Sequence, residues 1–290
     1  MRHVALCVAL MLIVASIMVL PVFAAGNTKG GFTPLDLPER KAIMKTTMDF
    51  SIDPDVVTTA STDKWAVIIG ISDYYGTGSD LQYCDDDAYD VQWVLINKYG
   101  FPSANIKMLI DGQATYANII SAIDWLLANE TSASTAVFYY SGHGTYKSGD
   151  PDGDGEYTDE AIVPWELSRL YDGTLATKFN NLDSLKSWFS FDSCYAGGMN
   201  DAGITGTGTV DTMGCKETEL CGESSSVRNG FFTYLMVDQS MRYNYGDTNG
   251  NGLIETEEAF TYAKNNMYRY SSTQHPVVND QYTGYQYIGG

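Results

Sequence analysis

Two residues with nucleophilic or basic side chains each follow a short apolar run. His143 comes just after the run Ala136–Tyr140, and Cys194 comes just after the run Trp188–Phe191. If these runs are neighbouring strands of one parallel sheet, the imidazole and the thiol share a crevice at the carboxyl ends of the strands. An imidazole that takes the thiol proton makes the sulfur a nucleophile for acyl groups. The spacing therefore predicts a Cys–His pair for acyl transfer.

Glycines near the two residues support this prediction. Gly142 and Gly144 flank His143, and their small size lets backbone N–H groups approach a substrate carbonyl. The N–H groups of Gly144 and Cys194 are the expected donors to the oxyanion that forms on attack. A lone buried cysteine is usually a small hydrophobe, so the prediction depends on the two loops coming together.

The pattern of apolar runs predicts the elements that bring them together. Short β-branched runs alternate with segments of helical period, which predicts an α/β fold with a mostly parallel central sheet flanked by helices on both faces, a three-layer sandwich. Strands are expected at 65–72, 106–110, 136–140, 188–191 and 210–215, and helices at 85–99, 114–129, 231–243 and 255–268.

The charge balance limits the candidate partners. The 290 residues carry 36 acidic and 17 basic side chains, a formal charge of −19. Such a chain repels phosphates, so nucleic acid and anionic lipid are excluded as expected partners, while divalent cations and basic peptides remain. No organic cofactor is expected.

The N-terminus predicts export. Residues 1–24 combine Arg2, an apolar run from Val4 to Val22 and a small residue at Ala24, which is typical of a cleaved signal peptide. The alternative is an uncleaved anchor, because the run approaches the roughly 20 residues that span a bilayer. Either places the rest outside the cytoplasm, in the extracellular space or on the exterior of the cell envelope. Residues 25–63 are expected to be a linker or pro-segment before a domain at 64–290.

Several stretches of that domain resemble the caspase-like cysteine peptidases, the metacaspase type more than the animal caspases. Cys194 follows His143 by 51 positions, close to the caspase spacing of about 50. Asp-Ser-Cys at the nucleophile replaces the Gln-Ala-Cys of animal caspases and is the metacaspase form. The resemblance implies an endopeptidase with Cys194 as nucleophile, His143 as general base and then acid, and an acyl-enzyme intermediate. The matching stretches are Lys64–Ser72, Leu81–Asp90, Phe138–Gly144, Asp159–Pro164, Phe191–Gly198 and Gly230–Tyr234.

The same resemblance implies cleavage after arginine or lysine, with Asp87, Ser141 and Asp192 in the pocket for the P1 side chain. Physical chemistry agrees, because carboxylates beside a low-dielectric cleft favour a cation and penalise an acidic side chain. Acids at 85–87 could instead stabilise a helix N-terminus, and Asp192 could instead orient its loop. A corollary is self-processing on loops around the nucleophile, after Lys178, Lys186, Lys216 or Arg228.

A calcium loop of the EF-hand type is predicted at residues 247–258, between two expected helices. Oxygen ligands fall at the required positions, with Gly252 at position 6. The alternative is a plain Asn-Gly turn. A single carboxylate among the first five positions predicts weak affinity, about 10⁻⁴ to 10⁻³ M. The expected ligands are Asp247, Asn249, Asn251, the carbonyl of Leu253, Glu255 and Glu258.

A second acidic loop begins at Asp150 in the same way but has Ala161 at position 12. It could be a solvated loop. The family resemblance also suggests a calcium site beside the catalytic loops, for which Asp159, Glu166 and Asp201 are candidates.

Two other classes of function stay open. One is a catalytically silent caspase-like module that binds calcium and basic peptides. The other is a structural zinc protein that uses His143 and Cys194, although ligands with metal-finger spacing are scarce. Cys215 and Cys221 are near enough in sequence for a disulfide, and His275 is assigned no chemistry.

Overall fold

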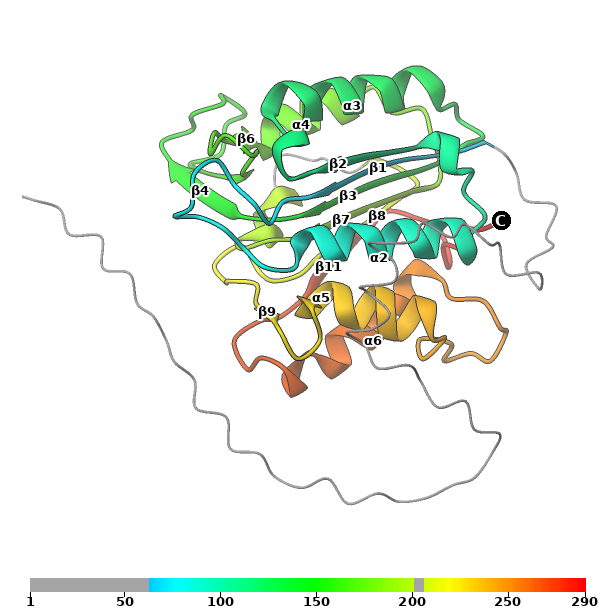
Figure 1. Cartoon of the computed structure of the whole chain (residues 1–290). Coiled ribbons are helices and arrows are strands. Elements are labelled where there is room, and N and C mark those ends of the chain that lie inside the picture. Colours follow the sequence, from blue (N-terminus) through cyan, green and yellow to red (C-terminus); the bar gives the residue numbers. More distant parts are fainter. Residues whose placement is uncertain (1–62, 201–205) are drawn as a thin grey trace, which may run out of the picture. The chain divides into compact units, whose positions relative to one another are not determined.

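The computed structural model describes residues 63–200 and 206–290, and a six-stranded sheet lies at its centre. The strand order is β11-β8-β7-β3-β1-β2, with β11 antiparallel to β8 and the other neighbours parallel (Figure 1). The predicted fold class is confirmed. The strands are β1 (Lys64–Gly70), β2 (Ile106–Ile110), β3 (Thr135–Ser141), β7 (Ser187–Asp192), β8 (Thr209–Met213) and β11 (Val277–Asp280).

Helices cover both faces of this sheet. Figure 1 shows α3 and α4 on one face and α2, α5 and α6 on the other. The helices are α2 (Cys84–Asn97), α3 (Tyr116–Asn129), α4 (Asp172–Phe179), α5 (Phe231–Thr233), which continues into the π-helix η4 (Tyr234–Arg242), and α6 (Thr256–Asn266).

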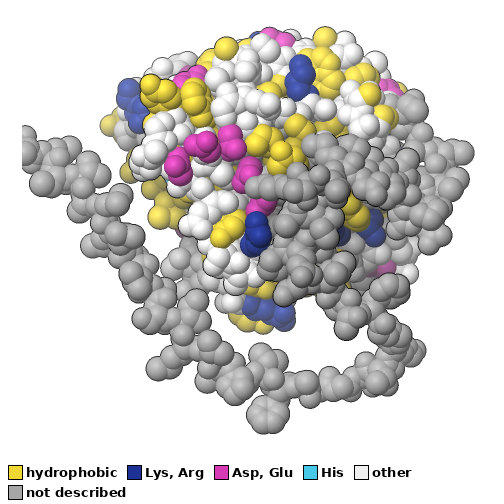
Figure 2. Space-filling view, in the orientation of Figure 1, with side chains coloured by type: hydrophobic (Ala, Val, Ile, Leu, Met, Phe, Trp, Pro, Cys, Tyr) yellow, Lys and Arg dark blue, Asp and Glu magenta, His cyan; other side chains and the backbone are white. Residues whose placement is uncertain are grey.

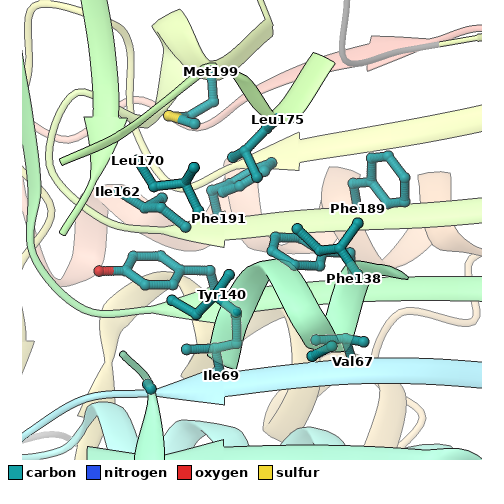
Figure 3. Close-up of a cluster of buried hydrophobic side chains, with 14 of the residues drawn as sticks. Val67, Ile69, Phe138, Tyr140, Ile162, Leu170, Leu175, Phe189, Phe191 and Met199 are labelled. Carbon is teal, nitrogen blue, oxygen red and sulfur yellow. The ribbon is translucent and has the colours of Figure 1, made fainter. Parts of the chain in front are cut away.

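The central strands are apolar along their length because both of their faces are buried. All seven residues of β3 are buried. Phe138 and Tyr140 point to the α3–α4 face, where Phe138 contacts Phe189 and Phe191 (Figure 3). Phe138 also contacts Phe179 of α4. An apolar layer on each face therefore holds the strands in position, and with them the ends of the strands at which the loops begin.

Helical period along 231–243 predicts one helix, and the structure has a short α5 followed by the π-helix η4. The smaller elements had no sequence signal, because strands of two residues are too short for a period and the sequences of β4 (GTYKS) and β5 (TDEAI) contain few apolar residues. These are β4 (Gly144–Ser148), β5 (Thr158–Ile162), β6 (Leu170–Tyr171), β9 (Glu223–Ser224), β10 (Asn229–Gly230), and the 3-10 turns η1 (Ser103–Asn105), η2 (Asp111–Gln113), η3 (Ala196–Asn200) and η5 (Met267–Arg269).

The predicted signal peptide (1–24) and all but residue 63 of the predicted linker lie outside the described residues, as does Asp201. Across 63–200 and 206–290, no helix is both long and apolar enough to cross a membrane. The loop placement of Lys178 was wrong, because it lies in α4 and pairs with Asp124 at 2.6 Å.

We predict that Phe138→Ala destabilises the domain by about 3–5 kcal/mol, because the cavity is walled by rigid rings that cannot collapse into it. Urea unfolding followed by tryptophan fluorescence measures this change. Tyr285→Ala is the control, since that side chain is 68% exposed and its loss should cost under about 0.5 kcal/mol. Equal midpoints for the two variants would contradict the prediction.

Candidate active site

The parallel pairing of β3 with β7 places the two reactive loops side by side. Ser141, the last residue of β3, is the register partner of Asp192, the last residue of β7. His143 and Cys194 therefore each lie two residues beyond the same rung of the sheet. Both line one small cavity of about 50 Å³. The predicted pair is thus brought to a common hollow.

The ring of His143 is oriented by a backbone carbonyl. Its Nε2 lies 2.7 Å from the oxygen of Ser79. A carbonyl only accepts hydrogen bonds, so Nε2 carries the proton and Nδ1 is the nitrogen left to act as a base. The backbone N–H of His143 donates to Tyr74 Oη at 2.7 Å, and the two rings pack 4.8 Å apart. These contacts hold the imidazole in one tautomer and one position.

The thiol of Cys194 is largely buried and held by weak contacts. Its Sγ lies 3.8 Å from the carbonyl oxygen of Cys221. Burial raises the pKa of the Cys194 thiol to about 11, so the sulfur is protonated at neutral pH and needs a base to react. Cys221 and Cys215 are free thiols with Sγ atoms 3.0 Å apart.

Gly144 packs against the nucleophile. A Cβ at this position would collide with the backbone carbonyl of Cys194 and lie 3.1 Å from its nitrogen. Only glycine permits this approach, which puts the two predicted oxyanion donors on neighbouring backbone segments.

The three residues expected in the P1 pocket also converge. Asp87 Oδ2 accepts from Ser141 Oγ at 2.8 Å, and Asp87 Oδ1 accepts from the N–H of Gly230 at 3.0 Å. Asp192 Oδ2 accepts from the N–H of Thr233 at 2.9 Å and from its hydroxyl at 2.8 Å. A Cβ on Gly230 would collide with Asp192 and lie 3.1 Å from Asp87 Oδ2. Gly230 thus lets both carboxylates meet at one point.

Sequence reasoning missed the second acid that lines this cavity beside Asp192. Glu223 lines it and accepts from the N–H groups of Gln82 and Tyr83, both at 3.0 Å. Burial first, and then neighbouring acids including Asp192, raise the pKa of Glu223, and burial also raises the pKa of Asp192. Among the described residues, no lysine or arginine lines the cavity.

Acidic side chains also gather at the surface around this end of the sheet. Figure 2 shows a group of them near the carboxyl ends of the parallel strands. The described lining of the cavity thus contains acids and no lysine or arginine, while Arg228 pairs with the neighbouring Asp86 at 3.7 Å.

A second acidic group, here called the acidic cluster, lies between β4, β5 and α4. Carboxylate oxygens of Asp150, Asp152, Asp154 and Asp159 lie within 4.8 Å of one another, and Asp154 forms a similar group with Glu156 and Asp172. Within the described residues, the buried oxygens of Asp152, Asp159 and Asp172 accept no hydrogen bond of ordinary geometry. Oxygen-only ligands of this kind suit calcium.

The cluster differs in membership from the sequence expectation. Asp172 belongs to it, with a pKa that burial and the neighbouring Asp152 and Asp154 raise to about 8. No spacing rule could have found it. The carboxylate of Glu166 lies instead against the first residue of α3, where it accepts a hydrogen bond from the N–H of Tyr116 at 2.9 Å. Neither described group includes His143 or Cys194, so nothing in it supports a zinc site on them.

The predicted calcium loop at 247–258 joins η4 to α6, the context it requires. Its first ligand position, Asp247, accepts hydrogen bonds from loop N–H groups, and Glu258 at position 12 folds back onto the loop. His275 lies away from the cavity and contacts Glu219 at 2.7 Å.

The raised pKa of Cys194 gives a testable pH dependence. With a chelator present to remove metal ions, the rate of Cys194 alkylation by iodoacetamide should rise about tenfold per pH unit from pH 7 to 10. The reason is that the fraction of thiolate rises about tenfold per pH unit below a pKa of about 11. Mass spectrometry of the modified peptide measures the rate, with Cys194→Ser as the blank. A plateau below pH 9 would contradict the effect assigned to burial.

Comparison with known proteins supplies the family. The caspase domain family matches residues 63–283. Metacaspase-4 of Arabidopsis thaliana is 34% identical over 181 residues, 59% of this chain and 42% of that protein. Metacaspase-1 of Cryptococcus neoformans is 41% identical over 111 residues, 36% of this chain and 24% of that protein. The matches span less than half the length of these relatives.

A solved structure supports the fold. The crystal structure of protein GSU0716 from Geobacter sulfurreducens superposes with a TM-score of 0.58 at 17% identity, covering 77% of this chain and 94% of that one. The order of elements, the family match and the curated relatives agree, and the chain belongs to the caspase family of cysteine peptidases, on its metacaspase branch.

Proposed function

We propose that the protein is a cysteine endopeptidase that cuts peptide chains after arginine or lysine. The observation that carries this proposal is that Asp192 and Glu223 line the same cavity as His143 and Cys194. Asp87 is fully buried behind that lining, where it accepts hydrogen bonds from Ser141 and Gly230. A P1 side chain in the cavity would thus lie beside the nucleophile, the base and two acids.

The chemistry follows from the two oriented side chains. Nδ1 of His143 takes the thiol proton while Sγ of Cys194 bonds to the carbonyl carbon, and the resulting oxyanion lies against the N–H groups of Gly144 and Cys194. The C–N bond then breaks, His143 gives its proton to the leaving amine, and a thioester remains. Water, deprotonated by His143, hydrolyses the thioester and restores the thiol.

The P1 preference follows from the cost of buried charge. Asp87 is fully buried and Asp192 is 5% exposed, so each carboxylate has lost most of its water. A guanidinium or ammonium group in the cavity beside Asp192 and Glu223 would offset this loss, whereas a P1 carboxylate would add a further buried negative charge.

Calcium is proposed to bind the acidic cluster, held by Asp152, Asp154 and Asp159, with Asp172 contributing through its place beside Asp154. The buried oxygens of Asp152, Asp159 and Asp172, without hydrogen-bond donors, fit a hard cation. The ion would neutralise the clustered carboxylates and order the loops from β4 to α4 next to Gly144. A requirement for calcium would follow, because these loops adjoin the oxyanion donors.

Two further parts of the proposal concern where the protein works and how it matures. Export is proposed from residues 1–24. Self-processing is proposed at Lys216, because it is exposed on the loop between β8 and β9, whereas Lys186 and Arg228 are partly buried. N-terminal sequencing of the secreted, active protein tests both.

We predict that Arg- and Lys-P1 peptides are hydrolysed and that Asp-P1 peptides are not. Cys194→Ala should lower kcat/KM by at least about 1,000-fold, and Asp192→Asn should lower it roughly 30-fold or more for arginine. Fluorogenic peptides measure both, with the surface variant Asp124→Asn as control. Tight binding of a basic peptidyl electrophile without turnover would instead identify a catalytically silent module, and turnover only after Asp would refute the P1 proposal.

We predict that EGTA abolishes hydrolysis and that Asp172→Asn raises the calcium concentration for half-maximal rate about tenfold or more, because one buried ligand charge is lost. Glu166→Gln is the matched control, since Glu166 lies at α3 and should leave the calcium dependence unchanged. Full activity of the wild type in EGTA would remove calcium from the mechanism.

A further inference from the structure

The loop 247–258 joins η4 to α6, on the face of the sheet opposite to α4 and the acidic cluster (Figure 1). The loop backbone is already folded around its first ligand. Asp247 Oδ1 accepts from the N–H groups of Gly250 and Asn251 at 2.7 and 3.1 Å, and Oδ2 accepts from Gly252 at 3.1 Å. Gly250 and Gly252 adopt φ of +74° and +81°, which side chains rarely allow.

The independent sign of a ligand is the carboxylate of Glu258, which is 4% exposed. Its Oε1 accepts from the N–H groups of Thr248 and Asn249, both at 3.1 Å, which directs the group into the loop. Its Oε2 is buried and accepts no hydrogen bond from an N–H or hydroxyl group in the described part of the chain; the group that lies beside it is the carboxyl of Glu255. A buried carboxylate oxygen without such a donor costs free energy unless a cation contacts it.

A second carboxylate faces the same space. Glu255 is 6% exposed and is held over the loop by the side-chain amide of Asn251 at 2.8 Å. Burial first, and the neighbouring Glu258 next, raise the pKa of Glu255, as expected for two acids pressed together. Two buried carboxylates therefore share one hollow.

The donor set selects the class of cation. All candidate ligands are oxygens, from carboxylates, amides and the Leu253 carbonyl, with no nitrogen or sulfur among them. A loop that offers six or more oxygens at adjustable distances suits calcium better than zinc, which prefers nitrogen and sulfur, or magnesium, which demands a rigid octahedron.

The position of the loop indicates what the ion does. Ile254, within the loop, accepts a hydrogen bond through its carbonyl from Tyr99 Oη at 3.0 Å, next to the end of α2. At its other end η4 continues from α5, where Thr233 holds the pocket acid Asp192. The loop therefore connects the helices that pack behind the proposed P1 pocket.

We propose that residues 247–258 form a structural calcium site, separate from the acidic cluster, that fastens η4 to α6. The proposal that calcium binds here does not rest on the proposed peptidase function. Only the inference that this calcium supports the P1 pocket rests on it.

The test uses the full chain carrying Cys194→Ala, so that no self-cleavage occurs. Equilibrium dialysis counts bound calcium, and thermal unfolding in EGTA and in about 10 mM CaCl₂ gives its stabilising effect, for which we expect a rise of about 3 °C or more. Glu258→Gln should lose one calcium per chain and most of the temperature rise. Asp172→Asn is the matched control. It should still bind one calcium in the loop 247–258 and keep the rise in unfolding temperature that this calcium causes.

The outcomes are distinct. Unchanged stoichiometry and temperature rise in Glu258→Gln would overturn the site, whatever the peptidase assays show. If Glu258→Gln does not fold in EGTA, Asp247→Asn decides by the same two criteria, because its amide oxygen still accepts a loop N–H group. Loss of both calcium effects in Asp172→Asn alone would assign the binding to the acidic cluster and equally overturn the proposal.

Discussion

The register between β3 and β7 is the constraint on which the site depends. The rung that pairs Ser141 with Asp192 ends both strands at one height, so each reactive residue follows its strand by two positions. A slip of one residue would turn every side chain of one strand to the opposite face. The packed apolar layers on both faces, including Phe138 with its three neighbouring rings, make such a slip prohibitively costly.

Buried negative charge is the second theme of the molecule. Asp192 and Glu223 line the cavity beside Cys194, four aspartates come together in the acidic cluster, and Glu255 and Glu258 are buried in the loop 247–258. Each of these places is where a cationic group is proposed to bind, a basic P1 side chain in the cavity and calcium in the other two.

Sequence reasoning found the features that depend on period and motif. Fully apolar strands such as β3 and the oxygen spacing of 247–258 are visible in the order of residues, and the family match confirmed the caspase-like resemblance. Contacts between distant segments are not visible in this way. Glu223 comes from a two-residue strand, and Asp172 joins the acidic cluster through the path of the loop between β5 and α4.

The hydrogen bond between His143 and Ser79 has an evolutionary and engineering consequence. In many hydrolases a carboxylate side chain orients the catalytic imidazole, and one substitution deletes it. Here the acceptor belongs to the main chain, so every amino acid at position 79 would retain it. Removing this acceptor would require rerouting the segment between β1 and α2, for example by an insertion or deletion. Libraries restricted to point substitutions would therefore sample this determinant poorly.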